Sequence, residues 1–195
     1  MLSKSFVKQF WMALNIKPQS AILCAILTLV IPLPWLLAWI IAAITHEICH
    51  CIAVWVCGGR IEQICVSLHG AEIQTCLKNK WQTIFCILSG PAGGLFLLLF
   101  SDSFPRIAVC ALFQSIYNLI PLYPLDGGRA LESFLKIVLP DIAAGNIFHK
   151  LEMLTILSII FGGVVLSIYW KLGWLPVLFI LYLLIQTKKI KIPCK

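Results

Sequence analysis

The sequence predicts an all-α polytopic membrane protein with about six transmembrane helices and one short β-hairpin between the second and the third. The chain is 61% hydrophobic and 12% charged, with a mean hydropathy of +0.97, whereas about a quarter of the residues in a soluble domain are charged. No charged side chain occurs between Pro18 and Thr45, and a helix needs about 20 apolar residues to cross a bilayer. We therefore expect the lipid bilayer to surround most of the chain.

The basic residues and the cysteines fit the same class. The net charge is +7, but no Lys/Arg cluster is interleaved with aromatic residues, so we expect no nucleic-acid partner. The nine cysteines include no CxxC pair. Most of them lie in apolar runs, where a free cysteine behaves as a small hydrophobic residue and not as part of a disulfide framework.

Proline and charge positions divide the chain into spans. Pro32 and Pro34 break the first apolar run. We place six spans at residues 20–31, 35–57, 81–100, 104–123, 153–170 and 172–186. The whole chain, 1–195, is then one intramembrane domain, with its spans paired within 20–57, 81–123 and 152–187. The segments between and beside these pairs are an interfacial lead-in at 1–19, a hairpin region at 58–80, a loop and cytoplasmic segment at 124–151, and a basic tail at 188–195.

The Lys and Arg residues predict the orientation. With the N-terminus in the cytoplasm, only Arg106 and Lys171 of the 15 basic residues fall in outer loops. This is the positive-inside distribution. It predicts a multi-pass protein of the cell membrane with both termini in the cytoplasm.

Residues 58–73 are predicted to form the β-hairpin. Apolar side chains alternate at Ile64, Val66 and Leu68, and glycines flank the segment. Alternation between glycine-rich turns is typical of paired strands and not of a helix.

Residues 46–50, which read HEICH, are the most informative motif. On a helix, positions four apart share one face, so the imidazoles of His46 and His50 could bind one metal ion. Glu47 lies about 100° round the helix and could reach a water without binding the metal. Ionisable groups inside a span are costly and usually functional. The structural alternative is that neighbouring helices merely satisfy these polar side chains.

Asp126 is the expected third ligand, because a catalytic zinc takes three protein ligands and leaves one position open. It lies in residues 118–129, NLIPLYPLDGGR, where two prolines and two glycines interrupt the end of an apolar span. A broken backbone at membrane depth is tolerated where it is buried in protein or lines a wet cavity. The alternative is a cytoplasmic turn in which Asp126 caps a helix that begins near Arg129.

HExxH in the second span together with NxxPxxPLDGG after the fourth resembles the site-2 protease family of intramembrane metalloproteases. The compact layout is similar to the bacterial sporulation branch, which processes pro-sigma factors. The resemblance implies that His46, His50 and Asp126 bind one Zn²⁺, that Glu47 is the catalytic residue, and that Asn118 helps to hold the substrate backbone.

Residues 89–94, SGPAGG, resemble the third-span GPxxN stretch of the same family. Gly94 stands where asparagine is common, which puts a polar role of this position in doubt. Small residues here still allow two helices to approach closely.

The expected function is a zinc-dependent endopeptidase that cuts in or near the transmembrane segment of a membrane-tethered protein. A pro-sigma or anti-sigma factor would be such a substrate, and a regulatory membrane protein could be a further partner. The metal acidifies a water and Glu47 takes its proton. The substrate helix must unwind first, and the edge of segment 61–68 could then pair with it.

Other functions stay open at this point. A membrane divalent-metal transporter could also place histidines and acids in a span, although Cys49 and Cys51 stand where one such family has a proline and a second acid. A prenyl-protein-processing protease would need a later glutamate ligand inside a span, and the chain has none there. The remaining polar residues are expected to be solvated: His69, His149, Glu132, Asp141 and Glu152.

Overall fold

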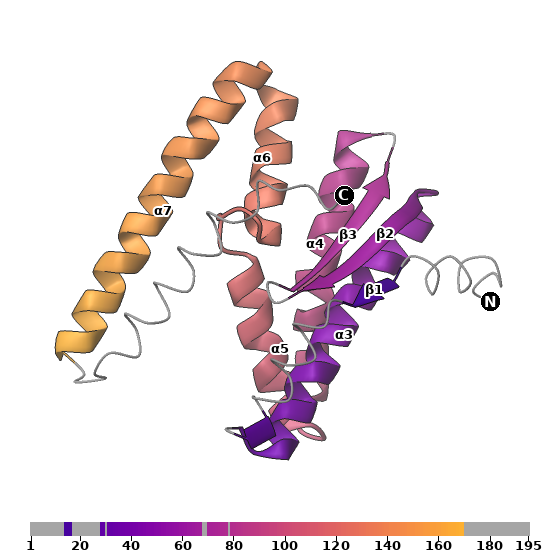
Figure 1. The fold of residues 1–195 in the computed structure, drawn as a ribbon, viewed down its shortest axis with the longest axis vertical. Helices are drawn as coiled ribbons and strands as arrows, with labels where there is room; N and C mark the ends of the chain where they lie inside the picture. Colours follow the sequence, from indigo (N-terminus) through magenta and orange to yellow (C-terminus); the bar gives the residue numbers. More distant parts are fainter. Residues whose placement is uncertain (1–13, 17–27, 30, 68–69, 78, 170–195) are drawn as a thin grey trace. The chain divides into compact units, whose positions relative to one another are not determined.

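The computed structural model describes residues 14–16, 28–29, 31–67, 70–77 and 79–169. These residues fall into two compact units, Met1–Tyr117 and Asn118–Lys195, and each is described on its own. In chain order the elements, drawn in Figure 1, are β1 (Leu14–Ile16), α3 (Leu33–Val56), β2 (Arg60–Ser67), β3 (Gly70–Cys76), α4 (Lys80–Phe96), η1 (Leu97–Phe100), α5 (Pro105–Asn118), α6 (Asp126–Val138) and α7 (Asp141–Tyr169).

Three helical segments are long and apolar enough to cross a membrane: Leu33–Val56, Lys80–Phe100 and Asp141–Tyr169. They correspond to the second, third and fifth predicted spans. The fourth predicted span, 104–123, contains the 14-residue helix α5, which ends at Asn118. Most of the first span, the sixth span, most of the lead-in and the tail lie outside the described residues, so the total of six stays a prediction.

Helix α3 begins and ends where the sequence predicts. Pro34 lies in its first turn, where a missing N–H costs nothing. At the other end Gly58 adopts a φ of +68°, a conformation that glycine adopts without steric cost. The N–H of Gly58 donates to Trp55 O, and that of Gly59 donates to Val54 O, which closes the helix in a Schellman motif. Its 24 residues extend about 36 Å, more than the hydrocarbon core of a bilayer.

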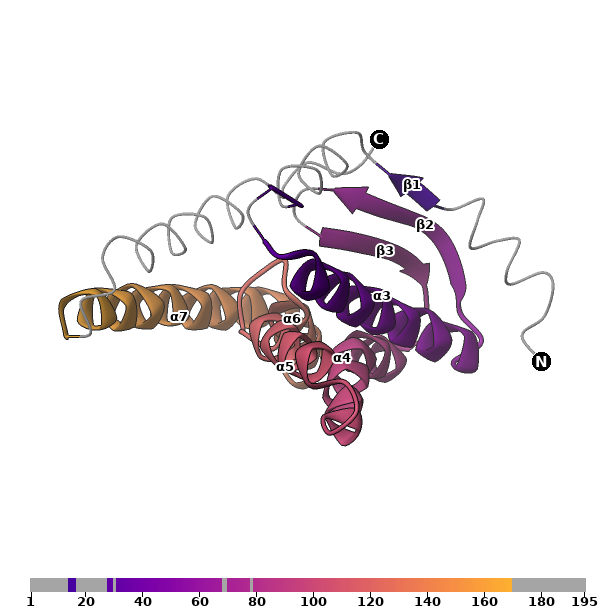
Figure 2. The same ribbon diagram turned by 90° about the horizontal axis from the view of Figure 1, so that it is seen from below.

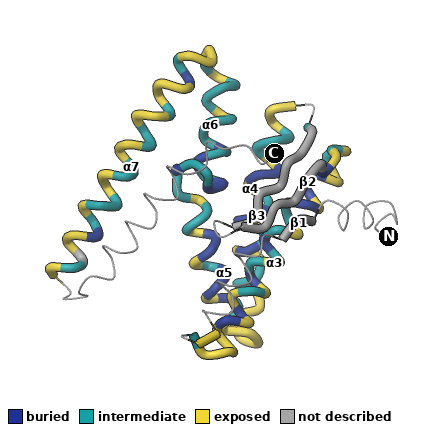
Figure 3. Tube along the Cα trace, viewed as in Figure 1, coloured by how far each residue is buried: buried dark blue, intermediate teal, exposed yellow. Residues whose placement is uncertain are grey.

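One side of α3 faces protein and the other faces outward. Ala38, Ala42 and His46 are buried at intervals of four residues, as expected for one helical face. Figure 3 shows buried positions along α3 and α5 and mostly exposed or half-buried ones along α7. Large apolar side chains occupy the exposed side of α3, as lipid contact requires: Leu37, Ile41, Ile44, Ile48 and Ile52.

Small residues bring α3 and α5 together. Ala38 and Ala42 of α3 form one buried cluster with Cys110 and Ala111 of α5. Side chains of this size let helix backbones approach closely in a membrane. The buried amide of Gln114, also on α5, donates to Trp39 O at 3.0 Å.

The predicted β-hairpin is present and belongs to a larger sheet. β2 and β3 pair antiparallel, and β1 pairs parallel with β2, with Leu14 opposite Ile64. The strand order is β1-β2-β3, and Figure 2 shows the three strands side by side next to α3. The edge of segment 61–68 was expected to be open for a substrate strand, and this is wrong for residues 64–66, because β1 already pairs there. β1 itself lies within the predicted interfacial lead-in at 1–19.

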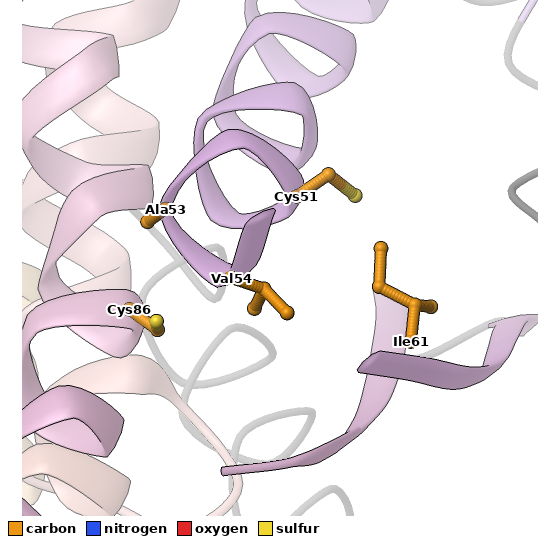
Figure 4. Packing of buried hydrophobic residues seen from close by; sticks show 5 residues of the cluster. All are labelled: Cys51, Ala53, Val54, Ile61 and Cys86. Atoms are coloured by element: carbon orange, nitrogen blue, oxygen red, sulfur yellow. The ribbon is translucent and has the colours of Figure 1, made fainter. Parts of the chain in front are cut away.

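A buried cluster attaches the start of the hairpin to the helices. Figure 4 shows Ile61 of β2 facing Cys51 and Val54 of α3, with Ala53 of α3 and Cys86 of α4 on the other side of the helix end. These five side chains are each 9% exposed or less. The sheet is therefore attached through β2 to the end of α3 that follows the HEICH motif.

The second unit is a helical pair preceded by an irregular stretch. Residues 119–125 form no helix, α6 then runs from Asp126 to Val138, and α7 begins at Asp141, earlier than the predicted span at 153. Pro140 lies immediately before α7, and no later proline interrupts the helix. Glu132 is a surface charge as expected, and its carboxylate pairs with Lys136 at 2.7 Å.

We expect Ala111→Leu to lower the free energy of unfolding by about 1–3 kcal/mol, because the larger side chain overpacks the contact between α3 and α5. Val109→Leu is the matched control, since Val109 is 40% exposed on the same helix. Reversible unfolding in mixed micelles measures both. Equal stability of the two variants would contradict the close α3–α5 contact.

Candidate metal centre

Two imidazoles converge on the buried face of α3. His46 is 5% exposed and His50 is half-buried. Their Nε2 atoms lie 3.2 Å apart, and the rings meet edge to face at an interplanar angle of 85°. Two nitrogens bound to one tetrahedral zinc, each about 2.0–2.1 Å from it, are about 3.3 Å apart. The pair therefore has the separation of two ligands of one ion.

A backbone carbonyl of α4 fixes the orientation of the second imidazole. His50 Nδ1 lies 2.7 Å from Cys86 O. A carbonyl oxygen only accepts, so Nδ1 carries the proton and the lone pair of Nε2 points towards His46. A hydrogen bond of this kind to the distal nitrogen is usual for histidines that bind metals.

A serine joins the same two helices beside the histidines. Ser89 Oγ lies 2.7 Å from Cys86 O on its own helix and 3.1 Å from Cys49 O on α3. The hydroxyl thus ties the backbone of α3 to α4 within one residue of His50. This link resists rotation of α3 about its own axis.

Gly90 allows α4 to pass directly against the imidazoles. A Cβ atom at this position would lie 2.5 Å from His50 Cε1 and 2.8 Å from His46 Nε2, closer than side chains tolerate. The prediction that small residues in 89–94 permit close helix approach is therefore confirmed. One turn further on, a Cβ at Gly94 would meet Ser115 of α5, so the space where the family often has asparagine is occupied by a serine hydroxyl.

Glu47 lies on α3 between the two histidines in sequence and is half-buried. The structure places it next to the imidazole-bearing face and not on the fully exposed side, where Ile44 and Ile48 lie.

In the second unit, Asp126 is the first residue of α6 and is 7% exposed. The helix begins at Asp126 itself, after Leu125, so the alternative of a cap for a helix beginning near Arg129 is wrong. The positive end of the helix dipole favours an ionised carboxylate there. Asn118 is the last residue of α5.

The irregular stretch folds back over the first turn of α6. A Cβ at Gly127 would meet the backbone of Leu119 and Ile120, and one at Gly128 would lie 2.7 Å from Tyr123 N. Only glycine permits this contact between the loop backbone and the helix. The glycines of the DGG sequence therefore fix the loop that leads to Asp126.

His46 and His50 of the first unit and Asp126 of the second each offer one atom that a metal ion could bind. Two imidazoles and one carboxylate are a donor set that catalytic zinc sites use, so the residues fit this metal. His69 lies outside the described residues. His149, expected to be a lone histidine, instead lies 3.6 Å from Glu152 through Nδ1.

Sequence reasoning did not identify the groups that support the histidines. Cys86 acts through its carbonyl oxygen, which every residue has, so its side chain gives no signal. Ser89 and Gly90 had a signal in the SGP sequence, but only as small residues between helices.

No protein-family model and no curated protein matches the sequence. Among solved structures, the site-2 protease from Methanocaldococcus jannaschii is similar, with a TM-score of 0.63 at 18% sequence identity. The match covers 90% of this chain and 87% of that chain. The chain therefore has the fold of a membrane site-2 protease. The likeness to the sporulation branch stays a prediction.

We expect Gly90→Ala to weaken zinc binding about 10- to 100-fold, as changes beside metal ligands do, because the new methyl group displaces both imidazoles. Ala92→Val on the exposed side of the same helix is the control and should bind zinc normally. Competition with a chromogenic chelator measures both affinities. Unchanged affinity in Gly90→Ala would show that α4 does not press against the histidines.

Proposed function

We propose that this chain is a zinc-dependent intramembrane endopeptidase that cuts a membrane-tethered protein in or near its transmembrane segment. The observation that carries the proposal is the 3.2 Å separation of the His46 and His50 Nε2 atoms on the buried face of a helix able to span a membrane. The site-2 protease fold supports it. No observation favours the alternative of a divalent-metal transporter.

The proposed ligands are His46, His50 and Asp126. The hydrogen bond from His50 to Cys86 O supports its role, because it turns the unprotonated nitrogen towards the partner imidazole. Asp126 is supported by its burial, which is rare for an aspartate without a specific function. One zinc per chain would leave a position open for water.

Glu47 is the proposed general base. Zinc held by such residues supplies a Lewis acid that makes a water acidic near neutral pH. The carboxylate of Glu47 takes the proton of the water that attacks the peptide carbonyl, and then gives it to the leaving amine nitrogen. Asn118, as the family resemblance implies, would hold the substrate backbone.

The substrate must present an extended peptide, because the backbone groups of a helix are hydrogen-bonded and shielded. Within the described residues the outer side of β3 has no paired strand, so a strand of the substrate could add there. A membrane-tethered pro-sigma or anti-sigma factor fits this description. We further propose that both termini lie in the cytoplasm and that a regulatory membrane protein is a partner.

We expect Glu47→Gln to retain zinc and to lose cleavage by a factor of about 10² or more, because the amide cannot take the proton. Asp126→Ala should lose zinc as well as cleavage, since it removes a proposed ligand. The measurement co-expresses each variant with single-span candidate substrates and follows release of the tethered domain, with zinc content determined on purified protein.

Glu132→Gln is the matched control, because it makes the same chemical change on α6 in a half-buried surface pair with Lys136. It should cleave like the unchanged chain. Full cleavage by Glu47→Gln would reject the assigned base, and normal zinc content in Asp126→Ala would reject the assigned third ligand.

A further inference from the structure

We propose that Glu152 of α7 is a positioning residue that holds the loop leading to Asp126. The side chain is 18% exposed, and its Oε1 accepts the backbone N–H of Tyr123 at 3.3 Å. Its effect on zinc rests on the proposed function, because that effect matters only if Asp126 is a ligand. Glu152 was expected to be an ordinary surface charge, but its side chain is largely buried and bonded to the loop backbone.

The backbone N–H groups of this loop show why an outside acceptor is needed. Pro121 and Pro124 have no N–H to satisfy. The N–H of Leu122 donates to Ile120 O at 2.8 Å, and that of Leu125 donates to Leu122 O at 2.9 Å. Tyr123 is the remaining residue of 121–125, and its N–H is bonded from α7 by Glu152.

The N–H of Tyr123 needs an acceptor because the loop lies between helices of a membrane protein. A non-helical backbone next to lipid is stable only where its polar groups are satisfied by protein or water. The bond from Tyr123 N to Glu152 Oε1 is 3.3 Å long, at the long end of the range for an N–H donor. It therefore depends on how far the side chain reaches from α7, and a shorter side chain would not make it.

Tyr123 is thereby held from two sides. The backbone nitrogen of Tyr123 packs against Gly128 in the first turn of α6, where a Cβ atom would not fit. The same N–H donates to Glu152 of α7. The turn from Leu122 to Leu125 then connects this fixed point to Asp126. Movement of Tyr123 would move the start of α6, and with it the carboxylate of Asp126.

His149 completes the arrangement. Its Nδ1 lies 3.6 Å from Oε2, the other oxygen of Glu152, one turn away on α7. The imidazole is 72% exposed, so the pair contributes little energy by itself.

Two variants of Glu152 test the length of its side chain separately from its charge. Glu152→Gln keeps the length and the acceptor oxygen but removes the charge, whereas Glu152→Asp keeps the charge but shortens the reach to Tyr123. We expect Glu152→Gln to stay within about threefold of the unchanged chain in zinc affinity, and Glu152→Asp to lose about 10- to 100-fold, the range known for residues behind metal ligands. Glu132→Asp on α6 is the control, because Glu132 is half-buried and pairs with Lys136, not with the loop.

Two readouts are measured on the full-length protein in micelles. Amide hydrogen exchange of the peptide covering 119–126, in metal-free protein, reports the loop without any assumption about function. The visible absorption of Co²⁺ added in place of zinc reports ligand geometry. Glu152→Asp should speed the exchange and change the Co²⁺ spectrum, while Glu152→Gln and Glu132→Asp should leave both as in the unchanged chain.

The outcomes are distinguishable. Unchanged exchange in Glu152→Asp would overturn the positioning role, and so would equal damage by Glu152→Gln and Glu152→Asp. If the unchanged chain binds neither metal while Glu152→Asp still speeds exchange, the proposed function fails and the anchoring of the loop stands.

Discussion

The fold depends on one close contact, the passage of α4 across the two imidazoles of α3. The contact requires glycine at position 90, an acceptor for His50 at Cys86 O, and a helix pair that cannot rotate, which Ser89 provides. In a membrane, apolar side chains gain little by packing against each other in place of lipid. Small residues and buried hydrogen bonds therefore stabilise the helix packing here, as a large hydrophobic core does in a soluble protein.

The second constraint is the need to satisfy every backbone polar group near lipid. The chain breaks its helices between α5 and α6, where Asp126 must be presented from an irregular stretch. Prolines remove two N–H groups there, turns pair two more, and a glutamate of α7 accepts another. If the chain is the proposed intramembrane protease, such residues would not meet the substrate but would make the broken backbone tolerable.

Only part of the three-stranded sheet could be predicted from the local sequence pattern. Alternation in residues 58–73 predicted the hairpin, and the structure confirms it, because strand alternation and glycine turns act over a few residues. The parallel partner β1 was not predicted. It comes from about 50 residues earlier in the chain, and three residues carry no periodic signal. As a result, the side of β2 expected to be open is partly occupied, and β3 has the outer position.

The sequence by itself determined the membrane class, the helix ends at Pro32–Pro34 and Gly58–Gly59, the shared helical face of His46 and His50, and the break before Asp126. Each of these follows from composition or from preferences between residues at most four apart. Only the tertiary structure decided the hydrogen bond from His50 to Cys86 O and that from Tyr123 to Glu152. These contacts join residues 36 and 29 positions apart in the chain. Nearly all residues have the same backbone N–H and C=O groups, so the sequence does not indicate which of these groups a distant side chain will bond.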